Sequence, residues 1–382
     1  MALLRWFLIS VLSLHAVAFA TEPPLGPQKA RWLLTRAGFA PSHPEAAEYA
    51  TLTHRAAVDR LLAGVRTTAV TPGPLWIDER LVPPREFRAM SDEQRRVQLQ
   101  KQVRMGLELR GWWIREMVAT RSPLTERMTL FWHNHFVSAQ PKVRYAQLMY
   151  RQNVLLRQHA LGRFDELLHA AAKDPAMLIY LDAVTSRRGS PNENFAREVM
   201  ELFTLGEGNY GEQDVKEAAR AFTGWSIDPA AGTYVFRRFL HDGDAKTVLG
   251  LSGRFDGDSV LDILLAQPST AEFIVGKLWR EFVSPEPDVA RVRSIAVQFR
   301  TGGWRIDGVV RALLMQPEVI ERNDDNALVK SPVDLVAGLV RQSGGELTAP
   351  VPAAVALAGM GQNLFSPPNV RGWPGGVAWI NT

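Results

Sequence analysis

The chain has 382 residues, of which 46% are hydrophobic, and its 44 lysines and arginines only slightly outnumber its 40 acidic residues. A net charge of +4 argues against a nucleic-acid partner, because nucleic-acid-binding proteins concentrate positive charge on one face. The sequence contains no cysteine, which excludes disulfides, thiolate metal sites and a thiol nucleophile. Packing of the core must therefore supply the stability.

The first twenty residues have the pattern of a secretory signal peptide. Arg5 precedes an almost unbroken apolar run over residues 6–18, and Ala18-Phe19-Ala20 has small residues where signal peptidase cleaves. A membrane anchor is the alternative, but the run is short for a span of about 20 residues, and no second run follows. We expect a periplasmic or secreted protein with no transmembrane segment after removal of residues 1–20.

Helix signals dominate the rest of the chain. Ser91-Asp92-Glu93-Gln94 has the form of a capping box, and apolar residues follow it at helical spacing. A polar cap followed by proline begins further helices at residues 122–123, 174–175, 190–191 and 331–332. These signals predict a mainly α, multi-helix globular fold, and we expect one domain over residues 21–382.

Only one region is predicted to contain strands. The β-prone residues 233–236 and 246–249 lie on either side of the turn-rich sequence His241-Asp242-Gly243-Asp244. This pattern predicts one short β-hairpin.

Five segments resemble the bacterial domain of unknown function 1800 family. They are residues 31–39 (RWLLTRAGF), 131–136 (FWHNHF), 191–206 (PNENFAREVMELFTLG), 241–250 (HDGDAKTVLG) and 372–376 (GWPGG). The resemblance covers nearly all of the chain after the signal. It implies a predominantly helical, often exported protein, and it carries no established activity.

The resemblance also has implications for a partner and for the C-terminus. Genes of this family are often found beside a second exported family related to the alkaline-phosphatase-like hydrolases, which makes such a protein the expected partner. Family members generally continue beyond the tryptophan that corresponds to Trp379. The chain is therefore expected to be either a short variant or a form without its last helical segment.

The segment after Ser190 is the main candidate for chemistry. Ser190 and Glu193 fit a capping box, and a predicted helix over the following residues has two faces. The apolar face contains Phe195, Val199, Leu202 and Phe203; the opposite face contains Asn194, Arg197, Glu198 and Glu201. Because such a helix would be covered on both sides, we expect the polar face to lie against a pocket.

Two histidines are the expected companions of this polar face. His133 and His135 are two positions apart, about 200° around a helix, so they cannot bind one ion together. His135 shares a face with Phe131 and Trp132 and is interpreted as a core residue, whereas His133 is a candidate. The second companion is His241 in the predicted turn.

The predicted catalytic residues are Glu198, Glu201, His133 and His241, and the predicted binding residues are Asn194, Arg197, Asp242 and Lys246. Carboxylates and imidazoles together would suit a divalent metal such as zinc, manganese or iron. The same carboxylates without a metal would suit acid–base catalysis, because one raises the pKa of the other. Lys246 would bind an anionic group of the substrate.

Three functions remain open. The chain is an exported hydrolase or metal-dependent enzyme built on this carboxylate–histidine cluster, or it is a non-catalytic binding or assembly factor for another exported protein or an envelope polysaccharide. The third alternative is that the carboxylate–histidine cluster is only a buried structural network without a function of its own.

Export gives the first testable prediction. The signal pattern predicts a mature protein that begins at Thr21. N-terminal sequencing of protein from the envelope fraction measures this directly, and an intact Met1 on cytoplasmic protein would contradict it.

Overall fold

The computed structural model describes residues 22–380, so the expected signal peptide lies outside the described residues. The N-terminal half contains α1 (Gly26–Ala37), α2 (His43–Ala50), α3 (His54–Ala63), α4 (Pro84–Ala89), α5 (Asp92–Ala119), α6 (Pro123–His135), α7 (Gln140–Val143), α8 (Ala146–Gln158), α9 (Phe164–Ala172), α10 (Pro175–Tyr180) and η1 (Ala183–Thr185). These elements and those that follow confirm the mainly α class.

The second half contains the strands and the remaining helices. Its helices are α11 (Glu193–Glu198), the π-helical η2 (Val199–Leu205), α12 (Glu212–Ala221), η3 (Arg238–Leu240), α13 (Gly257–Ala266), α14 (Pro268–Phe282), α15 (Val289–Thr301), α16 (Ile306–Leu314), η4 (Pro317–Val319), α17 (Pro332–Ser343), α18 (Pro350–Gly359) and η5 (Gly376–Trp379). Among residues 22–380, none of the helices combines the length and the apolar character that crossing a membrane requires.

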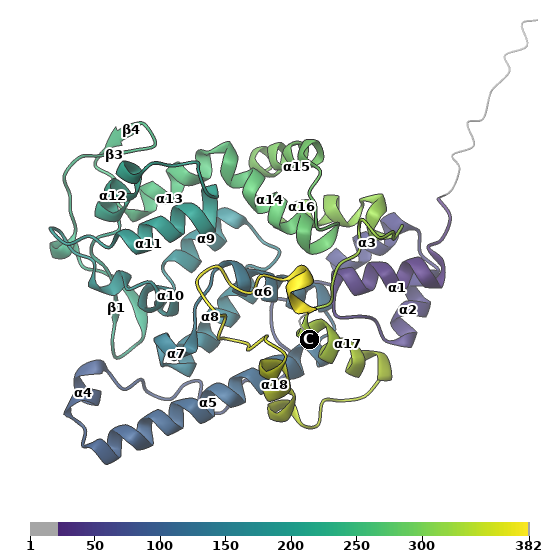
Figure 1. Ribbon diagram of the computed structural model, residues 1–382, viewed down its shortest axis with the longest axis horizontal. Coiled ribbons are helices and arrows are strands. Elements are labelled where there is room, and N and C mark those ends of the chain that lie inside the picture. The colour runs from purple at the N-terminus through teal and green to yellow at the C-terminus, as the bar shows by residue number, and fades with distance from the viewer. Residues whose placement is uncertain (1–21, 381–382) are drawn as a thin grey trace, which may run out of the picture.

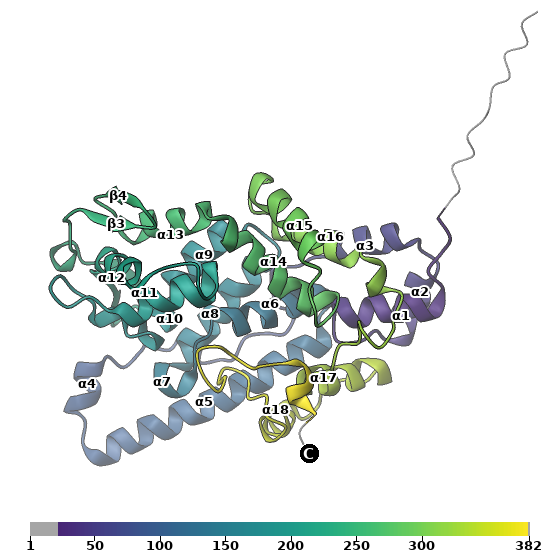
Figure 2. The same ribbon diagram turned by 45° about the horizontal axis from the view of Figure 1, so that its top comes forward.

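The long helix α5 runs along one edge of the molecule (Figure 1). Its C-terminal part packs against α17 and α18, while α6 and α8 lie beside it in the middle. Helices α1, α2 and α3 lie at one end of the protein, and α12 lies at the other end with the short strands. Turning the view by 45° keeps this arrangement, with α14, α15 and α16 between the two ends (Figure 2).

Several helices begin at a residue whose side chain caps the helix. The Ser91 hydroxyl accepts a hydrogen bond from the Gln94 N–H at 3.2 Å, and the Gln94 side chain accepts one from the Ser91 N–H at 2.9 Å. This reciprocal pair is the predicted capping box of α5. Asp174 caps α10 by accepting from the Met177 N–H at 3.0 Å.

The predicted strands exist, but they belong to two hairpins and do not pair with each other. β2 (Thr233–Phe236) pairs with β1 (Trp225–Asp228), and β3 (Lys246–Val248) pairs with β4 (Leu251–Gly253), both antiparallel. Each predicted strand pairs with a segment close to it in the sequence, because closing a short loop costs less conformational entropy than closing a long one. The β3–β4 turn consists of Leu249 and Gly250, both with positive φ, as in the tightest hairpin turns.

The centre of the fold contains one buried ion pair. Glu126 of α6 and Arg157 of α8 are each 1% exposed, and the Arg157 Nε–H donates to Glu126 Oε1 at 2.5 Å. Glu126 also accepts from the Trp113 Nε1–H at 2.9 Å, and the Arg157 guanidinium lies over the Trp112 ring. Both charges are therefore compensated inside the core.

Removing one partner of this pair should destabilise the protein strongly. Arg157→Met leaves the Glu126 carboxylate buried without its counter-charge, which we expect to lower the free energy of unfolding by about 3–5 kcal/mol. Urea denaturation measures the change. Arg188→Met, which breaks the exposed pair with Asp244, is the control and should change stability little. Equal effects of the two substitutions would contradict a dominant role for the buried pair.

Candidate functional site

The helix that contains Glu198 and Glu201 changes its geometry between these residues. α11 begins at Glu193 and is capped by Asn192, whose Oδ1 accepts from the Phe195 N–H at 3.2 Å, so the predicted Ser190 cap is wrong. After Glu198 the chain continues as the π-helical η2, in which the Gly206 N–H donates to the Glu201 carbonyl. π-helical turns are rare and are frequent at functional sites.

Glu201 is held by contacts to both of its carboxylate oxygens. The Tyr210 hydroxyl donates to Oε2 at 2.5 Å, and an Arg371 Nη–H donates to Oε1 at 2.8 Å. Burial, together with the hydrogen bond to Glu201, raises the pKa of Tyr210 to about 12, so the phenol keeps its proton and remains the donor. These two donors fix the position of the Glu201 carboxylate.

Glu198 lies one turn away in a different environment. Its side chain is half-buried, and within residues 22–380 it has no hydrogen-bond or ion-pair partner. Burial raises the pKa of Glu198, and the negative charge of Glu201 raises it further, while Arg371 and Arg197 oppose the shift. A carboxyl group with a raised pKa and no fixed partner can exchange a proton with a bound molecule.

Asn194 and Arg197, the other two residues of the predicted polar face, do not line a pocket with the glutamates. Asn194 is exposed, so the expectation that it faces inward is wrong. Arg197 pairs with Glu212 at the start of α12, through two contacts of 2.7 and 2.8 Å. The polar face lies at the protein surface because only the apolar face of this helix is covered by the core.

The contacts of the His133 side chain are with aromatic residues and not with Glu198 or Glu201. It is 1% exposed, and its ring packs against the rings of Trp113, Phe365 and Trp373, with centroids 5.2, 5.2 and 5.8 Å away. Neither ring nitrogen has a hydrogen-bond partner among the described protein atoms. Burial lowers the pKa of His133 to about 3, so the imidazole is neutral. His133 is a core residue in this structure.

His135 is also a core residue, as predicted. Its Nε2 lies 3.2 Å from the Phe203 carbonyl and donates to it, and its Nδ1 accepts from the Lys277 ammonium at 2.9 Å. These two contacts fix the neutral tautomer with the proton on Nε2. Burial, followed by the positive charge of Lys277, lowers the pKa of His135 well below its usual value.

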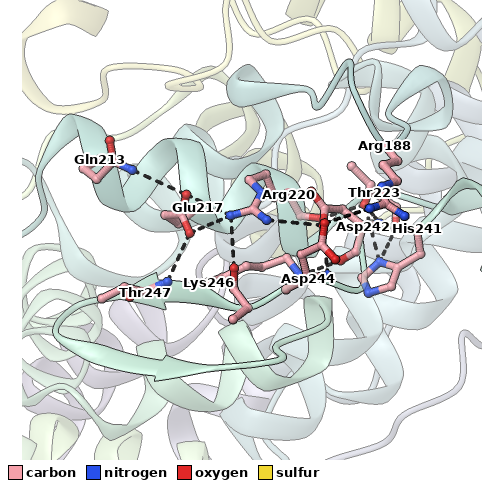
Figure 3. A network of polar contacts seen from close by, with 11 residues as sticks. Arg188, Gln213, Glu217, Arg220, Thr223, His241, Asp242, Asp244, Lys246 and Thr247 are labelled. Atoms are coloured by element: carbon pink, nitrogen blue, oxygen red, sulfur yellow. Dashed lines mark hydrogen bonds and ion pairs between the residues drawn. The ribbon is translucent and has the colours of Figure 1, made fainter.

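His241, Asp242 and Lys246 belong to a separate network (Figure 3). Arg220 of α12 lies between Glu217 and Asp242 and donates to the Asp242 carboxylate at 2.8 Å. Lys246, which is 2% exposed, donates to the carbonyl oxygens of Asp242 and Asp244.

The same network holds His241. Its Nδ1 lies 3.0 Å from the Thr223 carbonyl, and the Thr223 hydroxyl accepts from the Asp242 N–H at 2.8 Å. The side chains of Asp242 and Lys246 are thus occupied in fixing this turn, and burial lowers the pKa of Lys246. Lys246 was predicted to bind an anionic group of the substrate, but it is buried and its ammonium already donates to two carbonyl oxygens.

The predicted residues therefore divide among three places, and they do not form one carboxylate–histidine cluster. Within the described chain, no three or more His, Cys, Asp or Glu side chains are grouped so that they could hold a metal ion. The glutamates and histidines predicted to bind zinc, manganese or iron therefore do not lie together. The carboxylate pair of Glu198 and Glu201 remains as the part of the predicted site with unusual chemistry.

Two residues of this site were not predicted from the sequence. Arg371 directly precedes the GWPGG segment, and its arrival at Glu201 depends on how that segment crosses the protein. Tyr210 follows η2 by five residues in a turn, and no sequence pattern distinguishes it from an ordinary surface tyrosine.

The fold and the site define a mainly helical protein with a carboxylate pair at its surface. The chain belongs to the family described as "Protein of unknown function (DUF1800)", whose model matches residues 32–382. This confirms the resemblance found in the sequence. Searches of curated proteins and of solved structures found no match.

The surroundings of His133 predict that its imidazole is dispensable. His133→Leu removes two buried nitrogens that lack protein partners, so we expect the free energy of unfolding to stay the same or to rise. His135→Leu, on the same helix, breaks contacts to Phe203 and Lys277 and should lower it.

The pH dependence of stability provides a second measurement on the His133→Leu variant. An imidazole whose pKa falls from 6.5 to about 3 on folding binds protons better in the unfolded chain, so its contribution to stability is lost as pH falls through that range. His133→Leu should flatten this acid loss in urea titrations at several pH values. A steeper loss in the variant would show that the imidazole has a protein partner in solution.

Proposed function

We propose that this protein is an exported hydrolase that uses Glu198 for acid–base catalysis, with the Glu201 side chain held in place beside it. The supporting observation is the unequal environment of two neighbouring carboxyl groups. Glu201 has a donor on each oxygen, whereas Glu198 is half-buried, without a partner, and has a raised pKa. Pairs of titratable groups whose environments separate their pKa values are typical of acid–base sites.

The proposed roles follow from these contacts. The ionised Glu198 accepts a proton from a water molecule as the water oxygen forms a bond to the electrophilic centre of the substrate. Glu198 then returns that proton to the leaving group as the scissile bond breaks. Glu201 is held by Tyr210 and Arg371, and its negative charge helps to keep the Glu198 pKa high.

The charges around Glu198 favour an anionic substrate. Arg371 is largely exposed and uses one terminal nitrogen on Glu201, and Arg197 lies within electrostatic reach of Glu198. The Arg371 guanidinium would contact an acidic group of the substrate near the scissile bond, because both terminal nitrogens of Arg197 are already paired with Glu212. A metal-dependent reaction has no supporting set of ligands here, and we assign no step to a metal.

A non-catalytic binding or assembly role is the second candidate, and one surface feature favours it. A groove of about 630 Å³ between α4 and α5 exposes mainly apolar surface, from side chains that include Leu99 and Val103, which are 46% and 63% exposed, and arginines also line it. An exposed apolar groove is typical of a surface that contacts another protein. The partner would be the exported alkaline-phosphatase-like protein that the family resemblance implies.

The acid–base proposal predicts a selective loss of activity. Glu198→Gln keeps the shape of the side chain and removes its proton exchange, so turnover should fall by about 10²–10⁴-fold. Glu193→Gln is the matched control, because Glu193 is exposed on the same helix. Both variants and the mature protein are assayed on a panel of chromogenic esters, phosphoesters and glycosides, with acidic and neutral members of each class.

Stability serves as the second readout for the same variants. Burial raises the Glu198 pKa on folding, so the folded chain binds this proton more tightly, and stability falls as pH rises between the unfolded and folded pKa values. Glu198→Gln should remove that loss and be at least as stable as the wild type at neutral pH. Full turnover in Glu198→Gln, or equal losses in both variants, would refute the proposal.

The panel also separates the two candidate functions. A protein with no turnover of any substrate, whose complex with the exported partner is broken by Leu99→Glu and Val103→Glu together, would support the assembly role.

A further inference from the structure

The segment of residues 31–39 lines a cavity that the proposed hydrolase does not use. The cavity measures about 50 Å³ and lies between α1, α6, the start of α17 and the chain over residues 322–330. Among its lining residues are four cations: Arg36, Arg127, Arg322 and Lys330. One buried water needs roughly 10–15 Å³ on this measure, so the cavity has room for several such positions.

Arg36 carries a buried charge without a carboxylate partner. It is 5% exposed, and its terminal nitrogens donate to the carbonyl oxygens of Phe282, Val283 and Asn326 at 3.0, 2.5 and 2.6 Å. In the described chain no carboxylate lies within ion-pair distance of it. Burial, followed by the charges of Arg322 and Arg127, lowers the pKa of Arg36 to about 10. A buried guanidinium without a counter-charge is costly.

Three carboxylates close to this cavity are already paired with arginines. Arg127 pairs with Asp334 and with Glu281, the latter at 2.6 Å. Glu318 pairs with Arg291 at 2.7 Å. Among the described residues that line the cavity, four cations stand against one carboxylate, that of Asp334, so the excess charge is positive.

Arg322 and Lys330 are exposed at the edge of the cavity and supply that excess. Among residues 22–380 neither has an ion-pair partner, and the Arg322 guanidinium lies over the Trp32 ring with its carbon 6.0 Å from the centroid. Arg36 alone could be a structural clamp, because it ties α1 to the end of α14. That role does not account for two further unpaired cations at the same cavity.

We propose that this cavity binds a small oxyanion, phosphate or sulfate, with Arg322 and Lys330 at its edge and Arg36 behind them. Guanidinium and ammonium groups are the usual protein ligands of such anions, and charge-assisted hydrogen bonds to them are strong. An oxyanion would supply the counter-charge that the buried Arg36 lacks. The anion is either free or the phosphate group of a larger molecule such as a lipid.

Isothermal titration calorimetry with inorganic phosphate and with sulfate tests this on the mature protein at about 0.15 M ionic strength. The test variant is Arg322→Gln with Lys330→Gln, both at exposed positions. The control is Arg254→Gln with Lys216→Gln, which removes the same charge from exposed positions that do not line the cavity. Unchanged circular dichroism and melting temperature without anion confirm that each variant folds.

We expect saturable binding that weakens at least about tenfold in the test variant and no more than about twofold in the control. Vesicles with and without phosphatidylglycerol form the second arm. Binding to the anionic vesicles alone, lost in the test variant, would assign the phosphate group to a lipid. Equal weakening in both variants, or no saturable binding of either anion or of the vesicles below about 10 mM, would overturn the proposal.

Discussion

Glu126 and Arg157 face each other in the middle of the protein, with both charges removed from water. Inside a core, neither charge can be exposed or exchanged without a large cost, so α6 and α8 are fixed relative to each other. The same carboxylate binds the Trp113 indole, which fixes α5 against this pair. The rest of the fold is arranged around these three helices: α17 and α18 lie on α5, and α9 and α10 lie on α8.

The C-terminal end of α6 also fixes the segment that contacts the carboxylate pair of Glu198 and Glu201. Asn134 binds the backbone of Trp373 in two places, accepting from its N–H at 2.7 Å and donating to its carbonyl at 3.2 Å. Gly372 is required next to it, because its φ is +81° and a Cβ would lie 2.7 Å from the Asn134 carbonyl oxygen. The residue before this contact is Arg371, which reaches Glu201. Two distant sequence segments thereby meet through α6.

Local sequence signals predicted the helical class and the caps at Ser91, Asp174 and Ser331, because a cap depends on residues three apart in the chain; the cap at Ser190 was wrong. They also located the two strand segments, but not their pairing, which is decided by competition with nearer segments. The site was predicted only in part. An ideal helical wheel of 100° per residue does not apply after Glu198, where the π-helix begins, and it could not show that Asn194 would be exposed.

The histidines were the weakest part of the sequence prediction. A histidine is informative from sequence only if its neighbours in space are known, and those of His133 come from α5 and from residues 365 and 373. The turn at His241 shows the same limit, since Arg220 and Thr223 of another segment already occupy its polar groups. Long-range contacts of this kind leave no periodic pattern in the sequence.

The attachment of residues 369–373 to α6 has a consequence for the chemistry of Glu198. Arg371 lowers the Glu198 pKa, and its position depends on a segment without regular structure that is anchored by Asn134 and by the buried Trp373. Loosening that segment would withdraw a positive charge and make Glu198 a weaker acid, with no change in the helix that carries it. The acid strength of the site is therefore adjustable from the far end of the chain, by any molecule that competes for Arg371 or displaces the segment.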